Sequence, residues 1–227
     1  MKFFSPYLWV CVLCLPAFAF AHNISESNAQ FVEGVQGAAI APFLYLGAKH
    51  MVTGYDHLLF LVGVIFFLYR IKDVVLYVTL FTIGHSITLL AGVLGGLQVN
   101  AYIIDAIIGF SIVYKAFENM GGFKKVFHFE PNTKVAVLVF GFFHGLGLAT
   151  KLQDFNVSED GLVTNILSFN VGVEIGQMLA LTAILILLIR WRQHVSFDRH
   201  SFLANSLLMT GGFMLAGYQL TGFFVAA

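Results

Sequence analysis

The feature that most constrains this chain is a series of long apolar segments separated by short polar loops. Each one approaches or exceeds the roughly 20 residues that an α-helix needs to cross a bilayer, the fourth only if its Gly-rich end is included. Helices satisfy their backbone hydrogen bonds internally, as lipid requires. We therefore predict an all-α, polytopic membrane bundle of about six transmembrane helices. The segments lie at about 43–69, 74–96, 102–118, 135–150, 162–189 and 202–224.

The composition agrees with a membrane protein and excludes an ordinary soluble domain. Of the 227 residues, 59% are hydrophobic and only 11% are charged. The formal net charge is zero and no basic patch stands out, so nucleic acid is not an expected partner. The expected surroundings are a lipid bilayer, and the sequence leaves the oligomeric state open.

The N-terminus has the pattern of a secretory signal peptide that ends at residue 21. Lys2 supplies a minimal positive charge, Tyr7–Leu15 is an apolar core, and Ala19-Phe20-Ala21 is a small-x-small cleavage site. The alternative is an uncleaved first membrane helix. Cleavage is the better interpretation because the apolar run is too short to span comfortably.

Cleavage after residue 21 would remove both cysteines, Cys11 and Cys14, and with them every thiolate ligand. It would also make His22 the new N-terminus, either as an external metal chelator or as a solvated tail residue. The predicted division is then a signal peptide at 1–21, an external segment at 22–42 and a transmembrane bundle at 43–227.

Lysine and arginine predict the orientation. With the mature N-terminus outside, nine of these residues fall on the inner side and two on the outer side, as the positive-inside rule requires. Both termini would then face the periplasm across a bacterial inner (plasma) membrane. Three helices followed by three of opposite sense also permit an inverted repeat. The inner residues are Arg70, Lys72, Lys115, Lys124, Lys125, Lys134, Arg190, Arg192 and Arg199, and the outer ones are Lys49 and Lys151.

Ionisable residues recur at similar depths in four of the apolar segments. At 1.5 Å per residue, His57, His85, His144 and Glu174 lie about 14 to 24 Å from the inner boundary. Ionisable groups at such depth are usually functional, although any one histidine alone could be a packing residue. Three imidazoles with one or two carboxylates, Glu174 and Asp56, suit Ni²⁺, Co²⁺ or Zn²⁺.

The first apolar segment contains a second histidine, His50, seven residues before His57. In a continuous helix the two share a face but lie about 10 Å apart, too far to bind one ion. They would then be successive stations for the ion, unless Gly54 breaks the helix and brings them closer. Asp56 is either a further ligand or a partner that orients a neighbouring imidazole.

Four motifs in this order resemble those of the HupE/UreJ family of membrane proteins, and the second branch of that family most closely. The resemblance covers nearly all of residues 40–225. It implies a nickel or cobalt permease of the kind associated with hydrogenase and urease maturation, with His50, Asp56, His57, His85, His144 and Glu174 as metal ligands. The motifs are His50-x3-Gly54-x-Asp56-His57-Leu58-Leu59-Phe60, Phe81-Thr82-x-Gly84-His85-Ser86-Ile87-Thr88-Leu89, Phe143-His144-Gly145-Leu146-Gly147 and Phe169-Asn170-x-Gly172-Val173-Glu174-x-Gly176-Gln177.

The predicted function is facilitated inward transport of a divalent transition-metal ion. The chain has no Walker A pattern, so it does not itself hydrolyse nucleotide, and no catalytic residue is assigned. Two alternatives remain. One is an intramembrane metal-dependent hydrolase in which three histidines hold zinc and Glu174 or Asp56 acts as general base. The other is an accessory subunit in which the histidines bind a cofactor or only structure the bundle.

Overall fold

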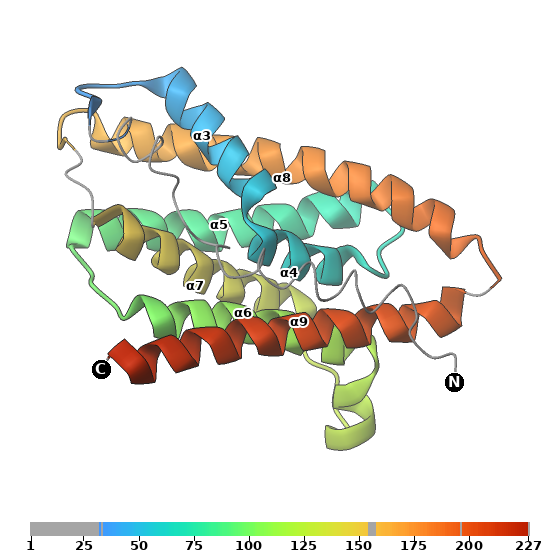
Figure 1. Cartoon of the computed structure of the whole chain (residues 1–227). Coiled ribbons are helices and arrows are strands. Elements are labelled where there is room, and N and C mark those ends of the chain that lie inside the picture. The colour runs from blue at the N-terminus through green and yellow to red at the C-terminus, as the bar shows by residue number, and fades with distance from the viewer. Residues whose placement is uncertain (1–31, 33, 154–157, 196, 227) are drawn as a thin grey trace, which may run out of the picture.

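The computed structural model describes residues 32, 34–153, 158–195 and 197–226, and all regular structure within them is helical (Figure 1). The predicted all-α class is confirmed. The predicted signal peptide and His22 lie outside the described residues. The elements are α3 (Ile40–Thr53), α4 (Tyr55–Ile65), α5 (Ile71–Gly95), α6 (Ala101–Asn119), a π-helical turn (Phe123–Phe127), α7 (Thr133–Gln153), α8 (Leu162–Arg192) and α9 (Phe197–Ala226).

Four of these helices, α5, α7, α8 and α9, are long and apolar enough to cross a membrane. The predicted count of six is therefore not confirmed by length and composition. The first apolar segment is split into α3 and α4 at Gly54, and α6 contains three charged residues. Those charges are paired within the protein: Lys115 lies 2.8 Å from Glu118, and Asp105 lies 2.8 Å from Lys151 of α7.

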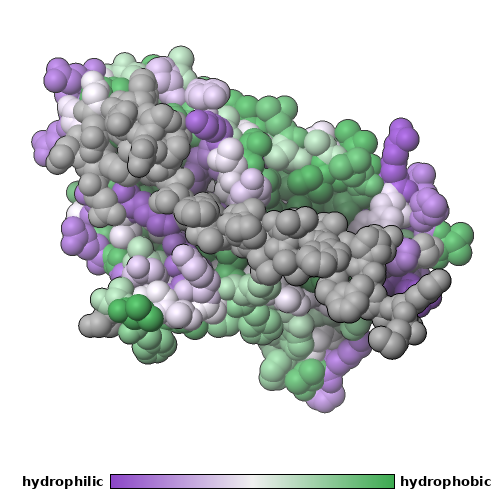
Figure 2. Space-filling model, viewed as in Figure 1, coloured by the Kyte–Doolittle hydropathy of each residue, from purple (hydrophilic) through white to green (hydrophobic). Residues whose placement is uncertain are grey.

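The helices lie alongside one another, so the bundle has two ends (Figure 1). We call the end where α4, α6 and α8 terminate the basic end, because Arg70, Lys124 and Arg190 lie there. α3 begins at the opposite end. Figure 2 shows hydrophilic residues mainly toward the two ends and hydrophobic residues between them. Large apolar side chains such as Leu179 and Leu187 are each 68% exposed, which is typical of a lipid-facing surface.

Glycines bring three pairs of helices into backbone contact: α3 with α8, α5 with α7, and α6 with α9. A Cβ atom on Gly47 would overlap the carbonyl of Phe169, and one on Gly84 would overlap the carbonyl of Leu138. A Cβ on Gly109 would likewise meet the backbone of α9. Such close approach gives dispersion contacts where no hydrophobic driving force separates helices from lipid. These contacts fix the rotation of each helix and so decide which side chains meet inside.

One side chain fixes the end of α4 to α8. The Arg192 guanidinium donates hydrogen bonds to the carbonyls of Ile65 (2.9 Å) and Leu68 (2.5 Å), and to that of Phe66. It also lies 4.4 Å from the centre of the Tyr69 ring. A cationic side chain on the last carbonyls of a helix satisfies acceptors that have no partner within the helix. This contact holds the basic end of α4 in place, and with it the residues at the other end of α4.

Candidate metal centre

The first apolar segment is not a continuous helix, and the break determines the centre. Gly54 has an extended backbone (φ −77°, ψ 92°), and its N–H donates to the carbonyl of His50 at 2.8 Å. The rings of His50 and His57 then lie with centroids only 5.0 Å apart. The interpretation of successive stations about 10 Å apart is wrong, because it assumed an unbroken helix. The alternative of a break at Gly54 is confirmed.

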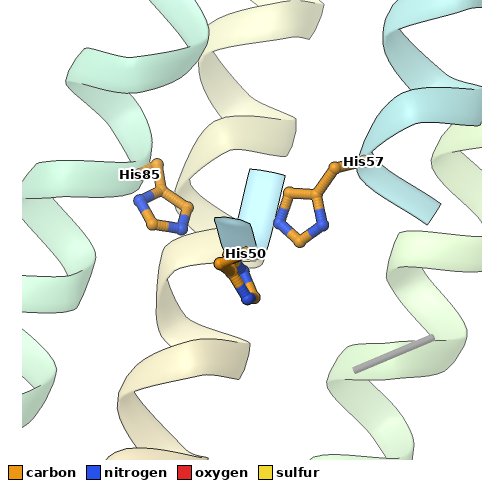
Figure 3. Close-up of side chains that lie close together, drawn as sticks. All are labelled: His50, His57 and His85. Carbon is orange, nitrogen blue, oxygen red and sulfur yellow. The ribbon is translucent and has the colours of Figure 1, made fainter. Parts of the chain in front are cut away.

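Four imidazoles from four helices meet around His57. The centroid of its ring lies 5.0 Å from that of His50, 6.2 Å from that of His85 and 4.7 Å from that of His144. Figure 3 shows the rings of His50, His57 and His85 turned toward one another. His57, His85 and His144 are fully buried. The polar residues that sequence analysis placed at a common depth in α4, α5 and α7 therefore share one interior site.

The ligand atoms form two overlapping groups. One nitrogen each of His50, His57 and His85 lie within 4.8 Å of one another. One ligand atom each of Asp56, His57 and His144 also lie within 4.8 Å of one another. Two nitrogens that bind the same tetrahedral ion are about 3.3 Å apart, so small side-chain shifts would close either group around a metal. His57 belongs to both groups and is the centre of the site.

In three histidines of the centre, the same ring nitrogen, Nδ1, makes a hydrogen bond. Nδ1 of His144 lies 2.8 Å from the Phe140 carbonyl, which can only accept, so this Nδ1 carries the proton. In the same way Nδ1 of His57 lies 2.9 Å from Asp56 Oδ1, and Nδ1 of His85 lies 3.3 Å from Asn170 Oδ1. In each ring Nε2 is then the basic nitrogen. Metal-binding histidines usually donate their other N–H to a carbonyl or carboxylate in this way.

The position of Asp56 fits both of the roles that the sequence left open. It orients His57 through the hydrogen bond to Nδ1, and its carboxylate is also one of the grouped ligand atoms. The side chain is 2% exposed and lies in the first turn of α4. The carboxylate therefore lies inside the protein at the N-terminal end of α4, beside His57.

Glu174 lies apart from the two groups in the part of the chain that the structure describes. Its Oε1 accepts a hydrogen bond from the Thr79 hydroxyl at 3.4 Å. It lines a groove between α5 and α8 together with Thr79, Thr82 and Ser86. Counting residues gives the height of a side chain in a helix but not the face on which it lies. The structure thus brings His50, Asp56, His57, His85 and His144 together, and does not bring Glu174 to them.

The contribution of α8 is Asn170, which sequence analysis did not assign to the site. Its amide oxygen orients His85, although the residue itself is not one of the grouped ligands. A signal was present, because Asn170 is a polar residue within an apolar segment and belongs to one of the four motifs. It was missed because the depth comparison covered only ionisable side chains.

A protein-family model described as HupE / UreJ protein matches residues 26–227, which is most of the chain. The chain belongs to the HupE/UreJ family. Searches of curated proteins and of solved structures each found no match. The four motifs of this HupE/UreJ chain supply all four histidines of the centre, together with Asp56 and the orienting Asn170.

This HupE/UreJ protein also has a cavity beside one ligand of the centre. The cavity has a volume of about 70 Å³ and extends along α3 from Phe43 to Thr53. His50 and Thr53 are its polar lining residues, and the other lining side chains are apolar, among them Phe43, Leu46 and Phe169. His50 therefore joins this cavity to the group of ligand atoms that it forms with His57 and His85.

Proposed function

We propose that this HupE/UreJ protein is a permease that carries a divalent transition-metal ion across a membrane. The ligands would be the four histidines of the centre together with Asp56. The observation that carries the proposal is the convergence of buried imidazoles, each from a different helix of a membrane-like bundle, on His57. Glu174, which sequence analysis included among the ligands, lies outside both groups, so the proposed ligand set leaves it out.

The proposed substrate is Ni²⁺ or Co²⁺, with Zn²⁺ as the third candidate. Neutral imidazole nitrogen is a borderline ligand that suits all three ions, whereas Mg²⁺ and Ca²⁺ prefer sets of oxygen ligands. Two overlapping groups around one shared histidine support movement of the ion between neighbouring positions, rather than one fixed structural site.

We propose further that six segments cross the membrane, with α3 and α4 together forming the first. Supporting this, the charges of α6 are paired within the protein, and a paired charge is tolerated at membrane depth. The basic end would face the cytoplasm of a bacterial cell, because most lysines and arginines lie there. α3 would then begin, and α9 end, at the periplasmic side of the inner membrane.

In that orientation the membrane potential alone favours uptake. An inside-negative potential stabilises an incoming divalent ion by about 4.6 kcal/mol per 100 mV. This corresponds to an equilibrium accumulation of roughly 2,000-fold. Facilitated inward transport therefore needs neither nucleotide hydrolysis nor a coupling ion.

The test is uptake of Ni²⁺, Co²⁺ and Zn²⁺ into proteoliposomes with an inside-negative potential. Wild type should accumulate at least one of these ions, and His57→Ala should fall to the level of empty liposomes, because His57 belongs to both ligand groups. His194→Ala, a change at an exposed histidine of the basic end, is the matched control and should keep wild-type uptake. Equal background flux for all three proteins would refute the permease. Stoichiometric bound metal without flux would favour the hydrolase.

A further inference from the structure

The two halves of the bundle share short sequence patterns at matching places. α3 contains Gly47-x-x-His50 and α7 contains Gly141-x-x-His144. α5 contains Phe81-x-x-Gly84 and α8 contains Phe169-x-x-Gly172. In each half, a helix with the G-x-x-H pattern comes first along the chain, and a helix with the F-x-x-G pattern follows it.

The contacts made by these patterns match as well. A Cβ atom on Gly47 would overlap the Phe169 carbonyl, and a Cβ on Gly141 would overlap the Phe81 carbonyl. In the reverse direction, a Cβ on Gly172 would overlap the carbonyl of Leu44, and a Cβ on Gly84 would overlap that of Leu138. Leu44 and Leu138 each lie three residues before the glycine of their G-x-x-H pattern. At these four glycines, the α7–α5 interface therefore repeats the contacts of the α3–α8 interface.

The two copies run in opposite directions. α3 starts at the opposite end and runs toward the basic end, whereas α7 starts at the basic end (Figure 1). Such a relation is an inverted repeat, with its pseudo-two-fold axis in the plane of the membrane. His50 and His144 occupy equivalent positions in the two copies. The ring of His57 lies almost equally far from both, at 5.0 and 4.7 Å, so the metal centre lies where the repeats meet.

The surroundings of the two equivalent histidines differ. Beside His50 lies the cavity of about 70 Å³, whose apolar lining includes Phe43, Leu46, Ile166 and Phe169. Leu89 of α5 and Leu148 and Leu152 of α7 also line the cavity, so it lies among α3, α5, α7 and α8 on the side of the opposite end.

Beside His144 the equivalent positions are filled. They are Val137, Phe140, Val78 and Phe81, which correspond in order to the four apolar lining residues from α3 and α8. Val78, Phe81 and Val137 are at most 1% exposed, whereas Ile166 and Phe43 on the cavity side are 3% and 6% exposed. The Phe81 ring centroid lies 4.9 Å from that of His144, and all four side chains belong to or pack against one hydrophobic core. The side of the centre next to His50 thus contains a cavity, whereas the equivalent side next to His144 is tightly packed.

We infer that this packed side is the closed exit route of the ion, and that His144 is the ligand that releases it toward the basic end. The inference rests on the proposed permease. His50 receives the ion from the cavity, His57 is shared, and His144 delivers the ion once Val78, Phe81, Val137 and Phe140 separate. Phe60 of α4 completes the plug, since its ring centroid lies 5.5 Å from that of Phe140 and 5.9 Å from that of Phe81. Because the repeats are equivalent, the exit opens as the α7–α5 side adopts the arrangement that α3 and α8 now have.

The test compares the equivalent positions Phe43→Cys and Val137→Cys in a chain with Cys11 and Cys14 replaced by serine. Each variant is treated in membrane vesicles with a membrane-impermeant thiol reagent, applied to one side at a time, with and without Ni²⁺. We expect Phe43→Cys to react from the side where α3 begins. Val137→Cys should react only from the side of the basic end, about tenfold faster during Ni²⁺ turnover because turnover populates the inward-open state.

Ni²⁺ uptake by the same preparations separates the two proposals. If the variants transport Ni²⁺ but Val137→Cys and a second probe, Val78→Cys, react from neither side, the exit route is wrong and the permease stands. Reaction of Val137→Cys from the same side as Phe43→Cys would also overturn the exit route. Absence of uptake by the wild type would instead refute the permease. Phe140→Cys, on a partly buried side chain, provides a third probe if the more buried variants do not accumulate in the membrane.

Discussion

The segment formed by α3 and α4 and the helix α7 pass the candidate metal centre at equivalent places, but the first is broken there and the second is continuous. Near His50 the helix breaks at Gly54 and restarts as α4, whereas α7 continues through His144 without interruption. The broken segment supplies His50, Asp56 and His57, and the continuous helix supplies only His144. A helix presents neighbouring ligands on one face only at intervals of three or four residues. Breaking the helix lets residues seven apart meet, which one unbroken helix does not allow.

The largest expected effect comes from removing the residue that both groups share. His57→Ala should lower Ni²⁺ affinity on the order of 1,000-fold, about 4 kcal/mol, because it removes one ligand from each group. His50→Ala and His144→Ala should each lower the Ni²⁺ affinity less, since each of these histidines belongs to only one group. Isothermal titration of the purified protein measures all three affinities. Equal losses for the three variants would contradict the central role of His57.

The next effect concerns the break itself. Gly54→Ala should lower Ni²⁺ affinity about 10- to 100-fold, the usual range for displacing the support of a ligand. A Cβ there would lie 2.9 Å from His57 Nδ1 and 3.0 Å from the His50 carbonyl, and alanine also favours a continuous helix. The same titration tests this.

Gly217→Ala in α9 is the matched control, since a Cβ there meets nothing within 4 Å. It should bind Ni²⁺ as wild type does. Unchanged affinity in Gly54→Ala would mean that the centre does not depend on the break.

A smaller effect is expected from the residue that orients His85. Asn170→Ala should lower Ni²⁺ affinity about tenfold, because the loss of the acceptor frees the imidazole to rotate. Asn170→Asp keeps an acceptor oxygen and should restore most of the affinity, which a purely structural role would not predict. Ser168→Ala, also on α8, is the control; its hydroxyl bonds to the Thr164 carbonyl and not to the centre.

The smallest effect is on stability. Arg192→Met should lower the free energy of unfolding by about 1–2 kcal/mol, because it removes the donors that satisfy the last carbonyls of α4. Thermal unfolding in detergent measures the change, with Arg190→Met, at an exposed position of the same helix end, as the control. A Tm equal to that of the control would show that α4 does not need this contact.

The sequence predicted the helices and the depth of the centre more accurately than it predicted which residues belong to the centre. Apolar length predicted α5, α7, α8 and α9, and the positions of His57, His85 and His144 along the chain predicted that they would meet. The membership of His50 depended on whether Gly54 broke a helix, and the residues permit either conformation. The place of Glu174 depended on the rotation of α8, which is set by contacts such as that of Gly172 with Leu44, far apart in sequence.

The presence of only one carboxylate, Asp56, among the grouped ligand atoms has a consequence for how long an ion would stay. In the proposed site, a divalent ion held by neutral imidazoles and by Asp56, the one carboxylate among the grouped ligands, would keep at least one unbalanced positive charge at the middle of the bundle. Asp105, the nearby acidic side chain of α6, is already neutralised by Lys151. An uncompensated charge in a low-dielectric interior is costly, which would raise the free energy of the bound state relative to a site with two carboxylates. The dwell time of an ion in the proposed permease would then be shorter than at a site with two carboxylates, which suits passage rather than storage.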